Sequence, residues 1–347
     1  AAVSDMSTLR QSWRCPTRGR GRTVMSRLAV LTSGGDAPGM NAAIRAVVRG
    51  GISLGMETFG VRHGYGGLIA GDFVSLGARD VGGIIEAGGT MLGTSRCPDF
   101  LTESGQETAV RQLMQRDIAA LVVIGGNGSQ KGAHALSQRG IAVVGVASTI
   151  DNDLAGSDIT LGATTALGTA LEAIDRLRVT ASAHGRVFLI EVMGRTCGYL
   201  ALMAGIAGGA EAIMIPEAED SPEHVAAAIQ DAYQRGKSHA IVVVAEGARY
   251  DADALARHFT EHAQRLRFEL RITKLGHVQR GGAPCPFDRL SASLLGAAAV
   301  ERIEAGQPTI LLGIVGGELT ATALAEVAHA RKPLDPQWLK LARTLAR

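Results

Sequence analysis

Residues 31–41, with the sequence LTSGGDAPGMN, decide the fold of this 347-residue chain. The apolar residues 28–31 that lead into the stretch are typical of a buried strand, and residues 41–49 that follow it are compatible with a helix. The glycines between them let the backbone come close to a ligand, and a helix N-terminus offers free N–H groups to an anion. The stretch therefore predicts a phosphate-binding turn in an α/β domain, although such turns are also common as structural elements.

The composition is that of a globular protein with little net charge. A formal charge of +2 and an aromatic content of 4% argue against a broad nucleic-acid-binding surface. No apolar run reaches the roughly 18 residues of a membrane span, and the length allows two domains. The four cysteines, at positions 15, 97, 197 and 285, lack metal-ligand spacing. Without a secretory signal they indicate a reduced, cytoplasmic setting.

Residues 1–24 differ from the rest of the chain. They contain several arginines among serine, threonine, glycine and proline, with little apolar periodicity, and we expect them to be disordered. An Arg- and Ser-rich segment of this kind is compatible with a transit peptide. The favoured interpretation is an upstream extension, because Met25 resembles a natural start.

From Arg27 onward, short apolar runs alternate with segments of helical length. The predicted strands are residues 28–31, 119–124, 141–146, 187–191, 212–215, 240–245 and 310–314, and the predicted helices are residues 107–115, 128–139, 161–180, 198–208 and 222–235. Most of these strands are continuous runs rich in β-branched residues, as expected for strands covered on both faces. The alternation predicts parallel sheets with right-handed crossovers, so ligands should bind at the carboxyl ends of strands.

Four further motifs carry groups suited to phosphate chemistry, and the first three of them follow predicted strands. Residues 125–129 (GGNGS) open a helix and predict a second phosphate turn. Residues 149–153 (TIDND) carry two carboxylates; a positioned carboxylate can take the proton of a hydroxyl that attacks phosphorus, although this sequence is also typical of an Asx turn. Residues 193–195 (MGR) and 276–282 (GHVQRGG) supply cations suited to phosphate.

These five motifs, in this order, resemble those of the ATP-dependent 6-phosphofructokinases, from about Arg27 to the C-terminal region. The resemblance implies two similar three-layer α/β domains with mainly parallel sheets. Residues 25–161 plus about 276–325 would bind ATP, and residues 162–275 plus about 326–347 would bind fructose 6-phosphate. It also implies a cytoplasmic, glycolytic homotetramer that uses Mg²⁺ to transfer the γ-phosphoryl of ATP to the sugar 1-hydroxyl.

The resemblance assigns roles residue by residue. The catalytic group would be Asp151 as base, Arg195 on the transferring phosphoryl, Thr149 and Gly35. The nucleotide would contact Gly35, Arg96, Cys97, Gly126, Asn127, Gly128 and Ser129. The sugar phosphate would contact Thr149, Asp151, Arg186, Met193, Gly194, Arg195, Glu246, Arg271, His277 and Arg280. Of these, Arg186 and Arg271 would come from a neighbouring subunit. Asp153 and Asn127 would lie at the metal.

A third set resembles the bacterial effector site for ADP or phosphoenolpyruvate. Its members are Arg45, Arg49, Arg178, Gly209, Glu211, Arg235 and Lys237. Arg45 and Arg49 lie four positions apart and so share a helix face, which is also compatible with a solvated basic surface. Ala78 stands where bacterial relatives often have an effector-binding arginine, and residues 82–83 (GG) replace a more polar stretch. We therefore expect weaker or altered effector binding.

Asn127 departs from the family pattern, in which an aspartate normally helps to hold Mg²⁺. An amide oxygen can bind a hard cation but brings no charge. This leaves open a catalytically weak regulatory or sugar-phosphate-binding subunit. A pyrophosphate-dependent relative is the other alternative; that branch tends to have Asp at position 128 and Lys at 148, whereas this chain has Gly128 and Ser148.

Overall fold

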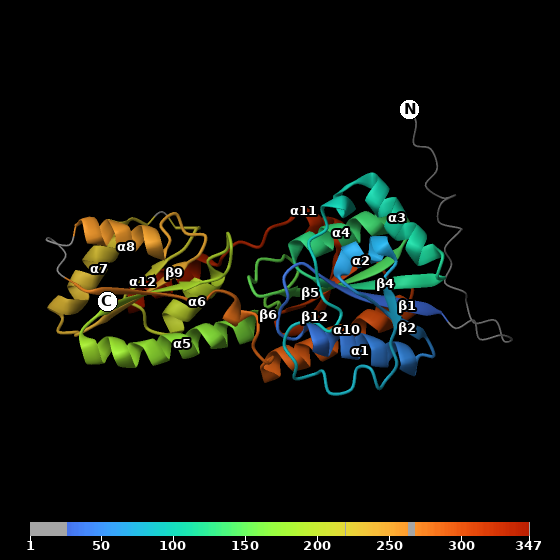
Figure 1. Cartoon of the computed structure of the whole chain (residues 1–347), viewed down its shortest axis with the longest axis horizontal. Coiled ribbons are helices and arrows are strands. Elements are labelled where there is room, and N and C mark those ends of the chain that lie inside the picture. Colours follow the sequence, from blue (N-terminus) through green and yellow to red (C-terminus); the bar gives the residue numbers. More distant parts are fainter. Residues whose placement is uncertain (1–25, 219, 263–267, 347) are drawn as a thin grey trace, which may run out of the picture.

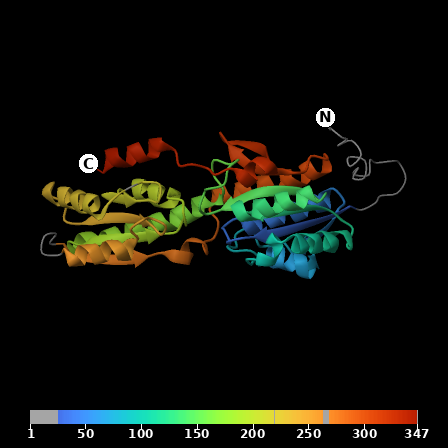
Figure 2. The same cartoon turned by 90° about the horizontal axis from the view of Figure 1, so that it is seen from above.

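The computed structural model describes residues 26–218, 220–262 and 268–346, so the disorder expected for residues 1–24 lies outside the described residues. The chain forms two bodies side by side, each a β-sheet flanked by helices (Figure 1). The same arrangement is visible from above (Figure 2). Both sheets are mainly parallel, which confirms the predicted α/β class. Among the described helices, none is long and apolar enough to cross a bilayer.

The sheet of the first body contains eight strands. Its order is β12-β11-β5-β4-β1-β2-β3, with β6 paired to β5. Only the two edge strands, β3 and β12, run antiparallel to their neighbours. The strands are β1 (Arg27–Ser33), β2 (Glu57–Val61), β3 (Phe73–Ser75), β4 (Ile118–Gly125), β5 (Ala142–Thr149), β6 (Leu161–Gly162), β11 (Ile310–Val315) and β12 (Glu318–Ala323).

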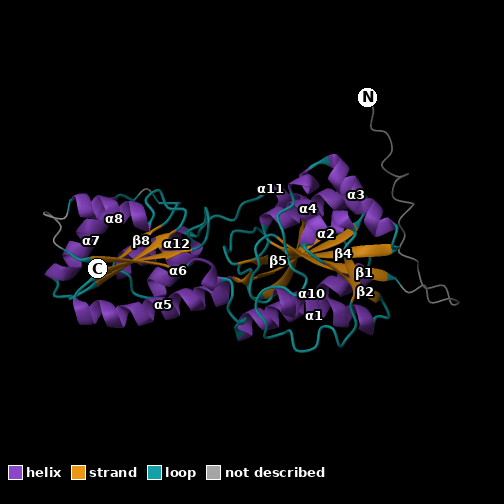
Figure 3. Ribbon diagram, in the orientation of Figure 1, coloured by secondary structure: helices purple, strands orange, loops and turns teal. Residues whose placement is uncertain are grey.

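Helices cover both faces of this sheet (Figure 3). One layer contains α1 (Met40–Ser53) and α10 (Pro286–Glu304), which pack against each other. The other contains α2 (Gly64–Ala70), α3 (Glu103–Met114), α4 (Asn127–Gln138) and α11 (Leu324–His329), with the 3-10 helix η2 (Pro98–Leu101) beside α2 and α3. Successive strand side chains point to opposite faces. In β1, Leu28 and Val30 accordingly join one apolar core and Ala29 and Leu31 the other.

The second body is built on a four-stranded parallel sheet of order β10-β7-β9-β8. Its strands are β7 (Val187–Val192), β8 (Ala212–Met214), β9 (Ala240–Ala245) and β10 (Leu270–Lys274). Its helices are α5 (Ala163–His184), α6 (Tyr199–Ala207), α7 (Pro222–Gln234), α8 (Ala252–Glu261) and the C-terminal α12 (Pro336–Leu345), which packs on α6. The 3-10 helix η3 (Gly276–Gln279) leads back toward the first body.

The predicted elements correspond to observed ones with shifted ends. The predicted helix 161–180 begins at Ala163, because Leu161 and Gly162 form the short β6 and Gly162 has a left-handed φ of 95°. The predicted helix 107–115 begins at Glu103, where Thr102 caps it by accepting from the Gly105 N–H. Because α11 packs against α4 in the first body, we propose that the last crossing between domains lies after residue 329.

All five motifs lie at carboxyl ends of strands. The first three follow β1, β4 and β5 of one sheet, and the other two follow β7 and β10 of the other. Neighbouring parallel strands end at the same edge of a sheet, which is where α/β proteins bind ligands. Residues from the two sheets approach one another across this region, as the contacts between Asp36 and Arg280 and between Asp151 and Arg195 show.

Candidate functional site

The opening turn after β1 is held from both sides. Ser129 Oγ donates to the Ser33 carbonyl at 2.8 Å, and Thr94 Oγ1 donates to the Gly34 carbonyl at 2.7 Å. A Cβ at Gly35 would lie 1.8 Å from Arg280 Nη1, at the end of a flexible side chain, so any side chain there would displace the guanidinium group. The glycine therefore allows a guanidinium group to rest directly on the turn.

The second glycine turn lies beside the first. Helix α4 begins at Asn127, and Ser129 in its first turn makes the contact to Ser33 that joins the two turns. The buried phenol of Tyr65 donates to the Ser129 carbonyl at 2.6 Å. Gly128 is exposed, with open space around it, and Arg96 is exposed in the segment before η2. The two turns thus offer backbone N–H groups on one shared surface, as a polyphosphate requires.

Asp151 is the most unusual carboxylate of the site. Its side chain lies in a residue that is only 5% exposed, and its Oδ1 has no hydrogen-bond partner among the described residues. Burial first, and then the negative charge of Asp153, raise its pKa to about 6, while Arg195 and Arg280 oppose this rise. Arg195 Nε lies 3.9 Å from Asp151 Oδ2. A buried, unsatisfied carboxylate beside a cation is a good candidate for a general base.

The loop that carries Asp151 is braced by Asn152. This residue has a left-handed φ of 52°, and its Oδ1 accepts from the Thr160 N–H at 3.0 Å. Its Nδ2 donates to the Asp158 carbonyl at 3.0 Å. The residue between the two aspartates therefore has a turn-forming role, and the structural interpretation of this motif is compatible with a functional one.

Asn127 and Asp153 are neighbours in the structure. Asn127 Nδ2 donates to the Asp153 backbone carbonyl at 3.4 Å. Among the described residues there is no group of three or more histidine, cysteine, aspartate or glutamate side chains that could hold a metal ion. A carboxylate and an amide oxygen beside a phosphate turn nevertheless fit Mg²⁺, which takes few protein ligands and is held largely by substrate phosphates and water.

The 193–195 turn after β7 is fixed by two side chains from other segments, Gln279 at the end of η3 and Glu246 directly after β9. Gln279 Oε1 accepts from the Met193 N–H at 2.8 Å. Glu246 Oε1 accepts from the N–H groups of Gly194 and Arg195, at 3.2 and 2.8 Å. One carboxylate oxygen of Glu246 therefore accepts from the turn that presents Arg195.

The predicted sugar-phosphate ligands do not lie together in a single chain. Arg186 precedes β7 and Arg271 lies near the start of β10, so both are at the amino edge of the sheet. The six residues of β7 span roughly 20 Å, at about 3.3 Å per residue. Both arginines instead pair with Glu269, to which Arg186 Nε donates at 2.8 Å. Their hydrogen bonds hold the pKa of Glu269 below its usual range.

His277 and Arg280, in contrast, lie at the carboxyl edge. His277 is exposed in η3, whereas the Arg280 side chain is 11% exposed and turns toward the opening turn. Its Nη1 is 3.8 Å from Asp36 Oδ1. His277 and Arg280, which were both predicted to bind the sugar phosphate of their own chain, therefore have different surroundings.

The predicted effector residues are divided between the two bodies. In the second body Lys237 Nζ pairs with the buried Glu211 at 2.7 Å, and Arg178 donates to the carbonyls of Gly208 and Gly209. Arg235 pairs with Asp231 and donates to the carbonyl of Ala346. The helix α1, with Arg45 and Arg49, packs on α10 in the first body (Figure 1). One chain therefore does not bring all seven together.

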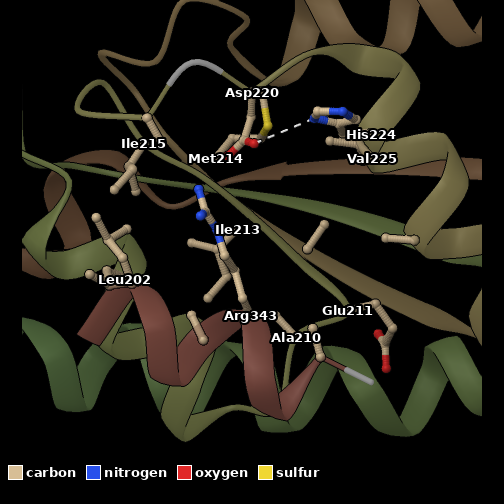
Figure 4. A pocket seen from close by; sticks show the side chains of 16 residues that line it. Leu202, Ala210, Glu211, Ile213, Met214, Ile215, Asp220, His224, Val225 and Arg343 are labelled. Carbon is tan, nitrogen blue, oxygen red and sulfur yellow. Dashed lines mark ion pairs between the residues drawn. The ribbon is translucent and has the colours of Figure 1, made fainter. Parts of the chain in front are cut away.

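A pocket of about 180 Å³ lies elsewhere, between β8 and α12 (Figure 4). Its lining is mainly apolar, with Leu202, Ile213 and Val225, and Arg343 reaches in from α12. Glu211 is the one predicted site residue in its lining. The pocket is thus separate from the glycine turns and Asp151.

Three polar residues that position the site were missed by the sequence analysis. Asp288 is completely buried and accepts from the N–H groups of Gly162 and Thr165, which ties α10 to the start of α5. Gln279 holds the 193–195 turn, and Glu269 joins the two distant arginines. Gln279 could have been noticed as part of the GHVQRGG motif, whereas nothing in the local sequence marks Asp288 or Glu269.

The comparisons with known proteins agree with this geometry. A family model described as "Phosphofructokinase" matches residues 27–303. The chain is 52% identical to "ATP-dependent 6-phosphofructokinase 1" of Thermus thermophilus and 50% identical to "ATP-dependent 6-phosphofructokinase" of Thermotoga neapolitana, covering 93% of this chain and all of each relative. The phosphofructokinase structure from Pichia pastoris is similar, at 35% identity and a TM-score of 0.82 over 94% of this chain and 37% of that one.

Sequence and fold therefore agree along most of the chain. The match to the family model extends across both bodies, from the opening turn to the end of α10, and contains all five motifs. The chain belongs to the phosphofructokinase family.

Proposed function

We propose that this protein is an ATP-dependent 6-phosphofructokinase of cytoplasmic glycolysis, which converts fructose 6-phosphate and ATP to fructose 1,6-bisphosphate and ADP. The observation that carries this function is the position of Asp151. It is buried beside two glycine turns, opposite Arg195 from the second sheet. The names of the Thermus and Thermotoga relatives support the same reaction.

In this reaction, Asp151 takes the proton of the sugar 1-hydroxyl while the hydroxyl oxygen forms a bond to the γ-phosphorus of ATP. The bond between that phosphorus and the oxygen of ADP breaks at the same time. Arg195, held by Glu246, neutralises the charge on the phosphoryl oxygens. Phosphoryl transfer depends mainly on positioning and charge neutralisation, and both are provided here by fixed turns and cations.

The ion implied by the family is Mg²⁺, and Asp153 and Asn127 are the residues that would hold it. When bound, it neutralises the phosphate oxygens of ATP. The hydrogen bond from Asn127 Nδ2 to the Asp153 backbone carbonyl makes the two residues neighbours, which supports this assignment.

ATP is the better phosphoryl donor for this site than pyrophosphate. Gly128 leaves open space at the second turn, and Ser148 is a small buried residue. Initial rates with each donor, at saturating fructose 6-phosphate and Mg²⁺, test this choice. Turnover with ATP and none with pyrophosphate is expected, and the reverse preference would select the pyrophosphate-dependent alternative.

The sugar site requires a second copy of the chain, in keeping with a homotetramer. Arg186 and Arg271 lie at the amino edge of their sheet, away from Asp151 of the same chain. A dianionic phosphate is held best by several convergent cations, and a neighbouring subunit would supply these two.

Replacing Arg271 by alanine should chiefly raise the KM for fructose 6-phosphate, because it removes one cation from the neighbour's site. Mixed tetramers of Asp151→Ser and Arg271→Ala subunits should then regain activity, since an intact base and an intact arginine meet at some interfaces. Activity is measured after the two proteins are dissociated and reassembled together, with each protein alone as control. Hybrids of confirmed composition that stay inactive would contradict a shared site.

The effector site would likewise be formed by two subunits. Arg45 and Arg49 of one subunit would face the predicted effector residues in the second body of another, among them Arg178. Replacing Arg178 by alanine should reduce the response to ADP or phosphoenolpyruvate at subsaturating fructose 6-phosphate, without changing kcat. The control is Arg176→Ala, since Arg176 is exposed on the same helix and pairs only with Glu172 among the contacts described. If neither ADP nor phosphoenolpyruvate changes the activity of the wild-type protein, these arginines are better explained as a solvated basic surface.

A further inference from the structure

The last segment that crosses between the two bodies passes the loop that carries Asp151. Residues 330–335 lead from α11 in the first body to α12 in the second, and Figure 2 shows them within the red part of the chain that joins the two. Lys332, in this crossing segment, makes two contacts with the loop. Its backbone N–H donates to the Asp153 carbonyl at 3.4 Å, and its ammonium group donates to the Asp158 carbonyl. The crossing segment therefore holds the loop at two points.

The ammonium group of Lys332 is held in a way that is unusual for a lysine. The residue is half-buried, and no ion pair neutralises it among the described residues. Burial lowers the pKa of Lys332 below its usual range, although the negative charges of Asp158 and Asp153 oppose this shift. Lysine side chains are normally solvated and lose conformational freedom when they are fixed. A lysine that instead donates to a backbone carbonyl indicates that the contact helps to place the loop.

The carbonyl that Lys332 contacts is a fixed point of the loop. Asn152 Nδ2 donates to the same Asp158 carbonyl at 3.0 Å, and Asn152 directly follows Asp151 in the chain. Asp151 Oδ1, in contrast, has no hydrogen-bond partner among the described residues. The position of the Asp151 carboxylate therefore depends largely on the backbone of the loop.

The second body carries the group that Asp151 faces. Arg195 Nε lies 3.9 Å from Asp151 Oδ2, although the two residues follow strands of different sheets. The crossing segment is continuous with α12, which packs on α6 of the second body. Lys332 therefore connects the loop of the base to the body that contains Arg195. Such a connection matters for reacting groups on two bodies, because a displacement of about 1 Å can cost roughly 10²-fold in rate.

On the basis of the proposed function, we infer that Lys332 is a positioning residue for the base and for the metal side of the site. It holds the 151–158 loop against the crossing segment, so that Asp151 and Asp153 keep their alignment with Arg195. The chemical steps remain those of the transfer described above. The hydroxyl proton goes to Asp151, and Lys332 keeps its own proton and donates to a backbone carbonyl throughout.

The first test compares the kinetics of Lys332→Met and Lys332→Arg. Methionine keeps the apolar stem and removes the donor, whereas arginine keeps both the charge and the donors. The backbone contact to Asp153 remains in both variants, so the comparison isolates the ammonium contact. For Lys332→Met we expect kcat to fall by roughly 10–100-fold, the range that a small displacement of reacting groups can cost. Lys332→Arg should recover most of the wild-type kcat.

The KM for fructose 6-phosphate should change less than about threefold in Lys332→Met, because a loss of alignment appears in kcat rather than in ground-state binding. The matched control is Lys340→Met. Lys340 is exposed on α12, just beyond the crossing segment, and its side chain makes no contact among those described. This variant should have the kcat and the KM of the wild type.

A second measurement does not depend on turnover. Calorimetric titration with Mn²⁺, in the presence of a non-hydrolysable ATP analogue, reports on the position of Asp153. Loss of a group that orients a metal ligand typically costs roughly 10–100-fold in affinity, so Lys332→Met should bind Mn²⁺ about tenfold or more weakly than Lys340→Met does. If Lys332→Met does not fold, Lys332→Gln takes its place, with the same losses expected from its shorter, polar side chain.

If Lys332→Met keeps a normal kcat or a normal Mn²⁺ affinity, whatever its temperature of unfolding, the residue has only a structural role and the inference is overturned. The same holds if Lys332→Arg is as slow as Lys332→Met. A wild-type protein without turnover would instead overturn the proposed function, and the Mn²⁺ titrations would then remain the test of how Lys332 places the loop.

Discussion

Replacing Asp151 by serine should lower kcat by roughly 10²–10⁴-fold, the usual range for loss of a general base. The reason is local. Asp151 is the buried carboxylate beside Arg195, and serine cannot accept the hydroxyl proton. The loss should appear in kcat at saturating ATP and fructose 6-phosphate, because the base acts as the bond forms and adds little to ground-state binding. Steady-state kinetics of the purified variant measure this effect.

The matched control for this variant is Asp151→Asn, which keeps the shape of the side chain and removes its negative charge and its basicity. Calorimetric titration with fructose 6-phosphate should give nearly wild-type affinity for both variants, which separates a chemical defect from a folding defect. If either variant turned over at close to the wild-type rate, Asp151 would not be the base, and the assignment of the 149–153 loop would be wrong.

Replacing Asn127 by aspartate should increase activity at low Mg²⁺. The amide at this position brings no negative charge to the metal side of the site, where hard cations prefer charged oxygens. Changing one group near a metal typically alters affinity or activity by roughly 10–100-fold. Asn127 lies beside Asp153; in Asn127→Asp the oxygen that replaces Nδ2 can no longer donate to the Asp153 carbonyl, so the carboxylate should turn toward the ion. We therefore expect the natural protein to be active, with a raised Mg²⁺ requirement.

The measurement is kcat against free Mg²⁺ for both proteins, together with calorimetric Mn²⁺ binding in the presence of a non-hydrolysable ATP analogue. Asn127→Ser serves as the control that removes the amide without adding charge. Equal curves for Asn127 and Asn127→Asp at every concentration would contradict this assignment of the metal ligands. If the natural protein shows no turnover and Asn127→Asp is active, the interpretation as a regulatory subunit is favoured.

Most interior strands and the ends where ligands bind could be predicted from sequence, because buried parallel strands have continuous apolar runs; the interior strand β2 lacks such a run and was not predicted. β1, β4 and β9 are buried along nearly their whole length and were all found. β10, whose five residues are half-buried or exposed, lies at an edge and lacks such a run. β12 is an edge strand with the same property. Their pairing depends on tertiary contacts that the local sequence does not describe.

The site was predictable where a short local sequence determines the backbone conformation, as in the glycine turns. It was not predictable where two distant segments meet. Asp288 is 123 positions from Thr165, and its role depends on how α10 packs against the start of α5. Arg280 lies close to Gly35, which is far away in sequence, and no local pattern predicts this approach. Glu269 was missed because its role depends on Arg186, which directly precedes the neighbouring strand β7.

The most direct test of the central claim is turnover by the purified protein with ATP, fructose 6-phosphate and Mg²⁺. Formation of fructose 1,6-bisphosphate is followed by coupling to aldolase, and formation of ADP is measured separately. The proposed function predicts one bisphosphate for each ADP, with a rate that rises with Mg²⁺ and disappears in Asp151→Ser. Hydrolysis of ATP without bisphosphate, or no product at any Mg²⁺ concentration, would contradict it.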